Sequence, residues 1–215
     1  MAEIIESVNH LICEGKADEV FFSRLLVSMH KNVQVACPKK ETDGAQGISA
    51  MHRRLQGLLP YFDKIERMVL AIDSDDDPDK AFEEGCKQFR KATRYPVPEK
   101  ASEFAEVDGC PRTAILLVPS ADKKGSLDTL LLKSFENKYR RKILSCVKKF
   151  CKCIESAKRG ETREAKLRLR ALIAASQEKN PGISLSFLLE EKNCPINLSH
   201  PSFDSIKTEL QKLFP

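Results

Sequence analysis

Four short apolar runs alternate with longer amphipathic stretches in the N-terminal part of the chain. Each run is too short for a helix and too continuously apolar for a strand with one wet face, so each predicts a strand buried on both faces. The alternation is typical of an α/β fold with a mainly parallel four-stranded sheet, right-handed crossovers and flanking helices. The expected strands are VNHLIC (ending at Cys13), Val33–Cys37, Met68–Ile72 and Thr113–Val118, and the expected helices between them are Asp18–Met29, Ile48–Phe62 and Pro78–Ala92.

Only helical patterns follow from residue 126 onward, separated by Gly and Pro residues. The sequence therefore predicts an α/β core over residues 1–125 and a helical region over residues 126–215 that packs on or beside it. The expected helices of this region are Leu127–Phe135, Tyr139–Ala157, Arg163–Glu178, Leu185–Glu190 and Ser202–Phe214.

Composition excludes several classes of protein. A chain of 215 residues that is 41% hydrophobic and 31% charged can bury a full core without disulfides. No apolar run approaches the roughly 18–20 residues that cross a bilayer, so we expect no membrane partner. Acidic residues stand where a signal peptide would be basic, which predicts a cytoplasmic protein. The eight cysteines contain no CxxC pair, and neither a Walker motif nor a Gly-x-Gly-x-x-Gly motif is present.

Glu14 directly follows the first expected strand, in the segment Cys13-Glu14-Gly15-Lys16-Ala17-Asp18. Open α/β sheets bind ligands at the carboxyl ends of parallel strands, and a carboxylate that ends a buried strand is costly unless something pairs with it. Asp18 falls in the first turn of the next helix, where its charge also suits the helix dipole. Glu14 therefore predicts a ligand site, whereas Asp18 has a structural alternative.

A second acidic segment, Asp73-Ser74-Asp75-Asp76-Asp77-Pro78, ends the third expected strand. In extended backbone Asp73 and Asp75 point the same way. Carboxylate oxygens, water and substrate phosphate are the ligands that Mg²⁺ prefers, and alternating aspartates at a strand end can supply them. Asp77 has a structural alternative as the cap of a helix that begins at Pro78.

These two segments together resemble the Toprim domain, which occurs in type IA topoisomerases, bacterial primases, ribosomal RNA maturases and overcoming-lysogenization-defect nucleases. The resemblance covers about residues 7–120. It implies that Glu14 acts in acid/base chemistry and helps to hold metal, and that Asp73 and Asp75 bind Mg²⁺ (or Mn²⁺). Asp18 stands where the nuclease branch carries a second acid. Pro78 departs from the Gly that many Toprim sequences have there.

A weaker resemblance, to small standalone Toprim-like proteins, covers the rest of the chain. It rests on Gly125-Ser126-Leu127-Asp128-Thr129-Leu130-Leu131 and on His200-Pro201 near the C-terminus. Glu14, Asp73 and Asp75 are the expected catalytic residues. The expected metal ligands are Glu14, Asp18, Asp73, Asp75, Asp77 and Asp128.

Positive charge is concentrated in residues 133–170, which hold 14 Lys and Arg against 4 Asp and Glu. A solvated helical face explains such a run, but near a site suited to phosphate chemistry it also indicates contact with nucleic acid. The candidate nucleic-acid-binding residues are Lys16, Lys123, Lys124, Lys148, Lys149 and Lys152.

Two functions remain open from the sequence. The first is a Mg²⁺-dependent nuclease or phosphodiesterase in which Glu14 relays a proton. The second is a module that binds nucleic acid or protein in a metal-dependent way without turnover. A small phosphoester substrate, the choice between DNA and RNA, and a homo-oligomeric state are also left open.

Overall fold

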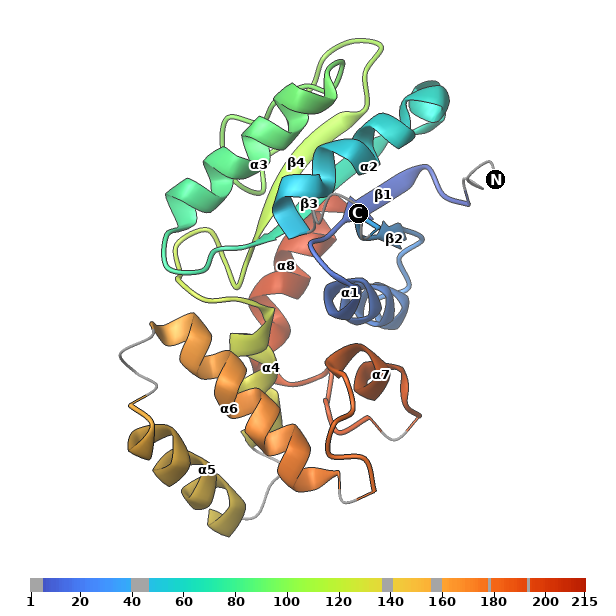
Figure 1. The fold of residues 1–215 in the computed structure, drawn as a ribbon. Coiled ribbons are helices and arrows are strands. Elements are labelled where there is room, and N and C mark those ends of the chain that lie inside the picture. The colour runs from blue at the N-terminus through green and yellow to red at the C-terminus, as the bar shows by residue number, and fades with distance from the viewer. Residues whose placement is uncertain (1–5, 40–46, 137–140, 156–159, 178, 193) are drawn as a thin grey trace.

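Four strands form a single parallel sheet in the order β2-β1-β3-β4 (Figure 1). The structure is a computed structural model that describes residues 6–39, 47–136, 141–155, 160–177, 179–192 and 194–215. The expected α/β fold, with a parallel four-stranded sheet flanked by helices, is confirmed. The strands are β1 Asn9–Ile12, β2 Gln34–Ala36, β3 Arg67–Asp73 and β4 Arg112–Val118.

The helices of the two sequence regions lie in different places relative to this sheet. In the N-terminal region they are α1 Lys16–Ser28, α2 Met51–Gly57 and α3 Pro78–Ala92. In the C-terminal region they are α4 Leu127–Glu136, α5 Arg141–Cys153, α6 Glu161–Ser176, α7 Leu185–Glu190 and α8 Asp204–Leu213. Figure 1 shows α4 to α7 gathered below the sheet, on the side to which the carboxyl end of β1 points. No described helix has both the length and the apolar character that a membrane span requires.

The inner strands bury both of their faces, as their continuous apolar runs predict. Leu11 and Val69 point into a core shared with α1 and the C-terminal helices, whereas their neighbours Ile12 and Leu70 point into a core shared with α2 and α3. β2 differs, because its three residues are only half-buried. The prediction of two buried faces is wrong for β2, since among the described residues this short edge strand pairs with β1 alone.

The predicted helix Ile48–Phe62 is wrong as one continuous element. The chain forms a 3₁₀ turn at Gly47–Ala50, then α2, and then a second 3₁₀ turn at Leu59–Lys64. Pro60 lies in that second turn and has no N–H to continue an α-helical ladder. The break turns the chain back toward the start of β3.

The helical region and the sheet share one hydrophobic core. Leu11 and Val69 of the sheet belong to the same cluster of buried side chains as Leu131 of α4, Leu169 of α6 and Phe203. In addition, α7 packs on α1 and α8 packs on β4. The helices beyond residue 126 are therefore fixed to the sheet and can contribute side chains to a site at its edge.

Gly85 allows α3 to approach the sheet closely. A Cβ at this position would lie 2.7 Å from Ile72 Cδ1 and 2.9 Å from Ile115 Cδ1. Both isoleucines are buried, so Gly85→Ala should lower the free energy of unfolding by about 1–3 kcal/mol in a urea titration. Gly57→Ala is the matched control, since a Cβ at Gly57 meets nothing within 4 Å. Equal stabilities of the two variants would contradict this account of α3 packing.

Candidate functional site at the carboxyl edge of the sheet

The strand order places a topological switch point between β1 and β3. From β1 the chain passes through α1 to β2 on one side, and the later strands β3 and β4 lie on the other side. The helices follow this reversal, because α1 belongs to one core cluster and α2 and α3 belong to the other. Open α/β sheets bind ligands at such a point, outside the carboxyl ends of the strands. Glu14 and Asp73 stand at these two strand ends.

Asp73 connects three elements through two hydrogen bonds. Its backbone N–H donates to Glu14 Oε1 at 2.9 Å, and its own Oδ1 accepts from the Leu127 N–H at 2.9 Å. The first bond joins the end of β3 to the residue that follows β1. The second joins it to the first turn of α4, whose N-terminus favours a negative charge. The backbone N–H of Ile48 also bonds to the Glu14 carboxylate.

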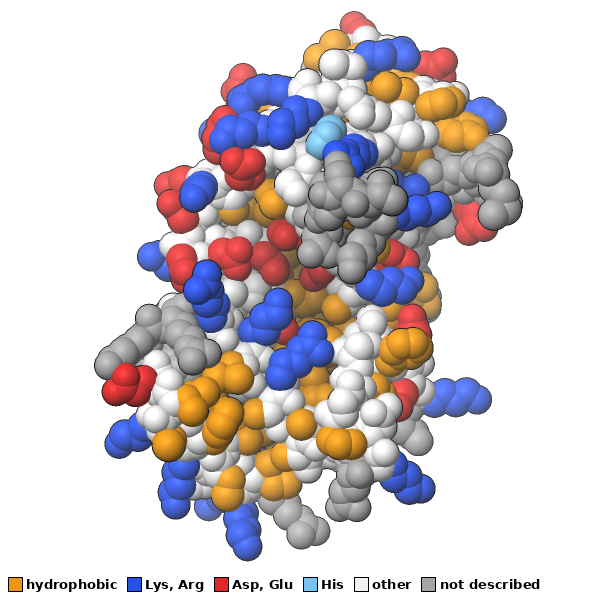
Figure 2. Space-filling model, in the orientation of Figure 1, with side chains coloured by type: hydrophobic (Ala, Val, Ile, Leu, Met, Phe, Trp, Pro, Cys, Tyr) orange, Lys and Arg blue, Asp and Glu red, His pale blue; other side chains and the backbone are white. Residues whose placement is uncertain are grey.

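Four carboxylates line one pocket of about 650 Å³ at this edge. We call it the acidic pocket, and its carboxylates are those of Glu14, Asp18, Asp73 and Asp128. Figure 2 shows acidic side chains in a band across the waist of the molecule, with basic side chains directly below them and a hollow between. The pocket therefore brings together four of the six predicted metal ligands.

Burial and mutual repulsion raise the pKa values of these carboxyls. Burial raises the pKa of Glu14 from its usual 4.5 to about 7, and Asp18 and Asp75 act in the same direction. Burial also raises the pKa of Asp18 to about 6, with Asp128 adding to it. The pKa of Asp73 is raised well above its usual value by burial and by the charges of Asp18 and Glu14. A carboxyl group whose pKa lies near neutral pH is suited to accepting and returning protons.

Asp18 and Asp128 are both first-turn residues, but they differ in what they contact. The Asp18 carboxylate bonds to the backbone of Gly15, the N-cap of α1, as the acid of a capping box does. Asp128 Oδ1 is buried and has no hydrogen-bond partner among the described residues. An orphaned buried oxygen is uncommon and is satisfied when a cation or a water binds beside it.

Asp75 and Asp77 do not line the acidic pocket. Asp75 adopts φ +47°, so the expectation of extended backbone through Asp73 and Asp75 is wrong. Its N–H and C=O pair with Gly125 at 2.7 Å each, which turns its side chain into a neighbouring hollow of about 300 Å³ that Asp73 also borders. Asp77 Oδ1 accepts the Lys80 N–H at 3.0 Å and caps α3, which confirms its predicted structural role.

The donor set of the acidic pocket fits a hard divalent cation such as Mg²⁺ or Mn²⁺. Such ions take oxygen ligands, and the four carboxylates, which include the orphaned oxygen of Asp128, could supply them. Within the described residues, no three Asp, Glu, His or Cys side chains are already arranged around a single metal position. Instead, one carboxylate oxygen of Glu14 and one of Asp73 each accept a hydrogen bond from a backbone N–H. Metal binding would therefore require these side chains to turn toward one another.

The predicted nucleic-acid-binding lysines are dispersed. Lys16 lines the acidic pocket but pairs with Glu19 at 2.7 Å. Lys123 and Lys124 are exposed in the loop before Gly125. The three α5 lysines are exposed and line a separate hollow of about 460 Å³, and they are Lys148, Lys149 and Lys152. Only Lys16 of the six borders the acidic pocket.

Two further cations that line the acidic pocket come from α6, and the sequence-based selection missed them. Lys166 and Arg170 line the pocket, and Arg163 precedes them on the same helix. All three lie within the basic segment 133–170, and their i, i+3, i+7 spacing would have placed them on one helical face. The sequence lacked the information that this face opposes the carboxyl edge of the sheet.

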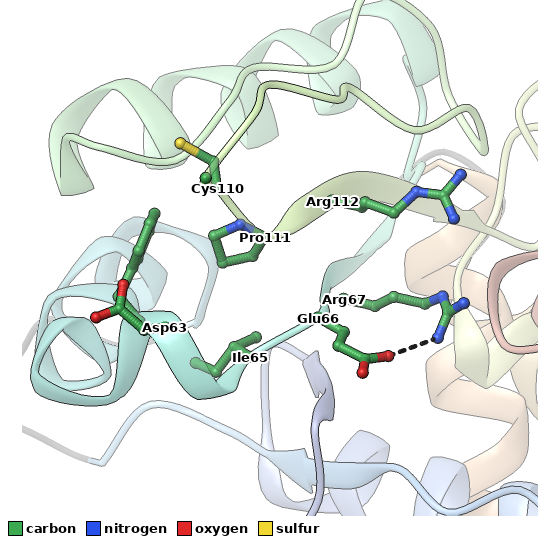
Figure 3. A pocket seen from close by; sticks show the side chains of 9 residues that line it. Asp63, Ile65, Glu66, Arg67, Cys110, Pro111 and Arg112 are labelled. Carbon is green, nitrogen blue, oxygen red and sulfur yellow. Dashed lines mark ion pairs between the residues drawn. The ribbon is translucent and has the colours of Figure 1, made fainter.

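A second hollow of about 530 Å³ lies at the opposite, amino-terminal edge of the sheet (Figure 3). Its cations are already engaged within the chain, as Arg67 pairs with Glu66 at 3.5 Å and donates to Asn9. Arg112 pairs with Glu106 and lies over the Phe104 ring. Figure 3 shows Arg67 and Arg112 extending away from Cys110 and Asp63 on the other side of the hollow. Both arginines of this hollow are therefore already paired with side chains of the described chain.

Stability should depend on pH through Glu14. Because its folded-state pKa lies above the usual 4.5, the folded chain holds a proton that the unfolded chain releases between about pH 4.5 and 7. The free energy of unfolding should therefore fall as pH rises through this window, by about 1.4 kcal/mol per pKa unit. Urea titrations in EDTA at pH 5 and pH 8 should show a smaller fall for Glu14→Gln, whose amide oxygen still accepts the Asp73 N–H. Glu99→Gln, at an exposed position, should behave as the wild type. Identical pH dependence in all three proteins would contradict the burial of a titrating Glu14.

Comparison with known families gives one match. The family model that matches is DUF3226, described as a protein of unknown function, and it covers residues 8–215. No curated protein and no solved structure matches the chain. The match extends over the sheet, the acidic pocket and all of the C-terminal helices. The chain therefore belongs to the DUF3226 family.

Proposed function

We propose that the chain is a Toprim-like, Mg²⁺-dependent enzyme that cleaves phosphodiester bonds in nucleic acid. The observation that supports this proposal is the acidic pocket, in which four carboxylates meet at the topological switch point of a parallel sheet. Bringing these negative charges together away from water lowers the stability of the fold, and a bound divalent cation would offset their repulsion. The resemblance of the Glu14 and Asp73 segments to the Toprim domain points to the same chemistry.

The acidic residues divide into two groups in this proposal. Asp73, Asp18 and Asp128 would hold the ion together with Glu14, and Asp75 and Asp77 would stand outside it. When bound, Mg²⁺ supplies charge neutralisation on the phosphate oxygens. Glu14 would accept a proton from the attacking water and return it to the leaving oxygen.

Positive charge outside the pocket supports a polyanionic substrate. The α5 lysines and Arg141 form an exposed basic surface around their own hollow. Lysines on such a surface attract a phosphate backbone without reading its sequence. In this proposal Lys148, Lys149 and Lys152 contact parts of a long strand that extend beyond the pocket, as do Lys123 and Lys124.

Binding without turnover is the alternative that one observation favours. The hydrogen bonds of Glu14 and Asp73 to backbone N–H groups give both residues a structural function that needs no catalysis. A module of this kind would bind metal and nucleic acid and leave the substrate intact. The two alternatives differ in a cleavage assay and agree in a metal-binding assay.

Metal binding should raise the melting temperature. At about a hundredfold excess over Kd, Mg²⁺ or Mn²⁺ should stabilise the fold by about 2.7 kcal/mol, or about 5–10 °C for a chain of this size. Asp73→Asn should abolish this rise, while its amide oxygen keeps the bond from Leu127. Asp108→Asn, at an exposed turn before β4, is the matched control and should keep the rise. An undiminished rise in Asp73→Asn would place the metal elsewhere.

Cleavage should require both the metal and Glu14. Labelled single- and double-stranded DNA and RNA, incubated with Mg²⁺, Mn²⁺ or EDTA, should show a product in at least one metal-containing reaction and none in EDTA. Glu14→Gln should lower kcat by about 100- to 10,000-fold, as loss of a general acid/base does. Metal-dependent binding of a substrate that stays intact would favour the alternative instead.

A further inference from the structure

The basic face of α6 is held opposite the acidic pocket by the packing of the rest of that helix. Its other face contributes four buried residues to the core, and they are Ala165, Leu169, Leu172 and Ile173. At its start, a Cβ on Gly160 would lie 3.2 Å from Asp76 Oδ2, so the N-terminus of α6 touches the acidic loop. Both anchors leave Arg163, Lys166 and Arg170 exposed on one face, and we call these three residues the α6 row.

The α6 row is near the carboxylates but not bonded to them. Among the described residues, none of its three members forms an ion pair, in contrast to Arg67 and Arg112 at the other edge of the sheet. Burial raises the pKa of Asp128, and the charges of Lys166 and Arg170 lower it. The opposed charges therefore interact across the pocket, and the space between them is open to a ligand.

A ligand that fits this space would place negative charge beside the α6 row and a bound cation beside the carboxylates. A phosphate group with its divalent ion has this character. Arg163 and Arg170 are seven residues apart, which corresponds to about 10 Å along the helix, more than one phosphate group spans. The pocket of about 650 Å³ has the size of a site for a small molecule or a single strand and is too small to enclose a duplex.

We propose that the α6 row binds successive phosphates of a single-stranded nucleic acid and places one of them over the acidic pocket. This inference rests on the function proposed above and assigns substrate recognition to the helical region. Lys166 and Arg170, which line the pocket, contact the phosphate nearest the carboxylates, and Arg163 contacts its neighbour in the strand. The α5 lysines lie in a separate hollow, so a short strand does not reach them.

The test compares two variants with the same change of charge. Both are made in the Glu14→Gln background, which permits binding measurements with Mg²⁺ without turnover. One carries Arg163→Gln, Lys166→Gln and Arg170→Gln, and the other carries Lys148→Gln, Lys149→Gln and Lys152→Gln. Binding of labelled eight-nucleotide oligo-dT and oligo-U is followed by fluorescence anisotropy at several salt concentrations. The two oligonucleotides distinguish DNA from RNA.

The α6 variant should bind at least tenfold more weakly, with a log–log salt slope smaller by about two, which is three phosphate contacts at about 0.7 each. The α5 variant should stay within threefold of the parent. Equal losses in both variants, or no loss in the α6 variant, would overturn the proposal. A duplex that binds better than the single strand, or a mononucleotide that binds as tightly, would also overturn it.

The rise in melting temperature with Mn²⁺ tests the proposed function independently of this inference, because it reports metal binding without any oligonucleotide. All the substituted side chains are exposed, so both variants should keep the melting temperature of their parent. If the α6 triple variant fails to fold, Lys166→Gln alone should still weaken binding at least threefold, and unchanged binding would overturn the proposal. If Mn²⁺ does not raise the melting temperature of the wild type while the α6 variant still binds oligonucleotide more weakly, the proposed metal chemistry is refuted. Phosphate binding by the α6 row would remain supported.

Discussion

The two hydrogen bonds of Asp73 hold together the parts of the molecule that make its site. One bond ties the end of β3 to Glu14 after β1, across the switch point of the sheet, and the other ties it to the N-terminus of α4. Because α4 begins the helical region, the same residue fixes that region at the carboxyl edge of the sheet. The structural connection and the ligand chemistry that we propose thus depend on the same residue.

The site is composed of two parts of the chain with opposite charge. The sheet and the first turns of α1 and α4 bring buried carboxyls, whereas α6 brings the exposed Lys166 and Arg170. Neither part alone would hold a metal-bound phosphate, since carboxylates repel phosphate and a basic helix repels the ion. The shared core of sheet and helices positions the two charges on opposite sides of one pocket.

The sequence predicted most of the sheet and the meeting of Glu14 with Asp73, because parallel strands bring their carboxyl ends to a common edge. It did not predict β2 as a half-exposed edge strand, since strand order is not written in local patterns. The left-handed Asp75 was missed because its conformation depends on pairing with Gly125, a residue remote in sequence. The position of α6 beside the pocket was missed for the same reason, as helix periodicity defines a face without stating what that face opposes.

A crystal structure of the protein soaked in Mn²⁺, with an anomalous difference map, tests the central claim most directly. The account predicts a peak in the acidic pocket, about 2.1 Å from carboxylate oxygens of Asp73 and of at least one of Glu14, Asp18 and Asp128. The carboxylates that bond to backbone N–H groups in the present structure would turn toward it. A pocket without a peak at saturating Mn²⁺, or a peak bound only at other surface acids, would contradict the account.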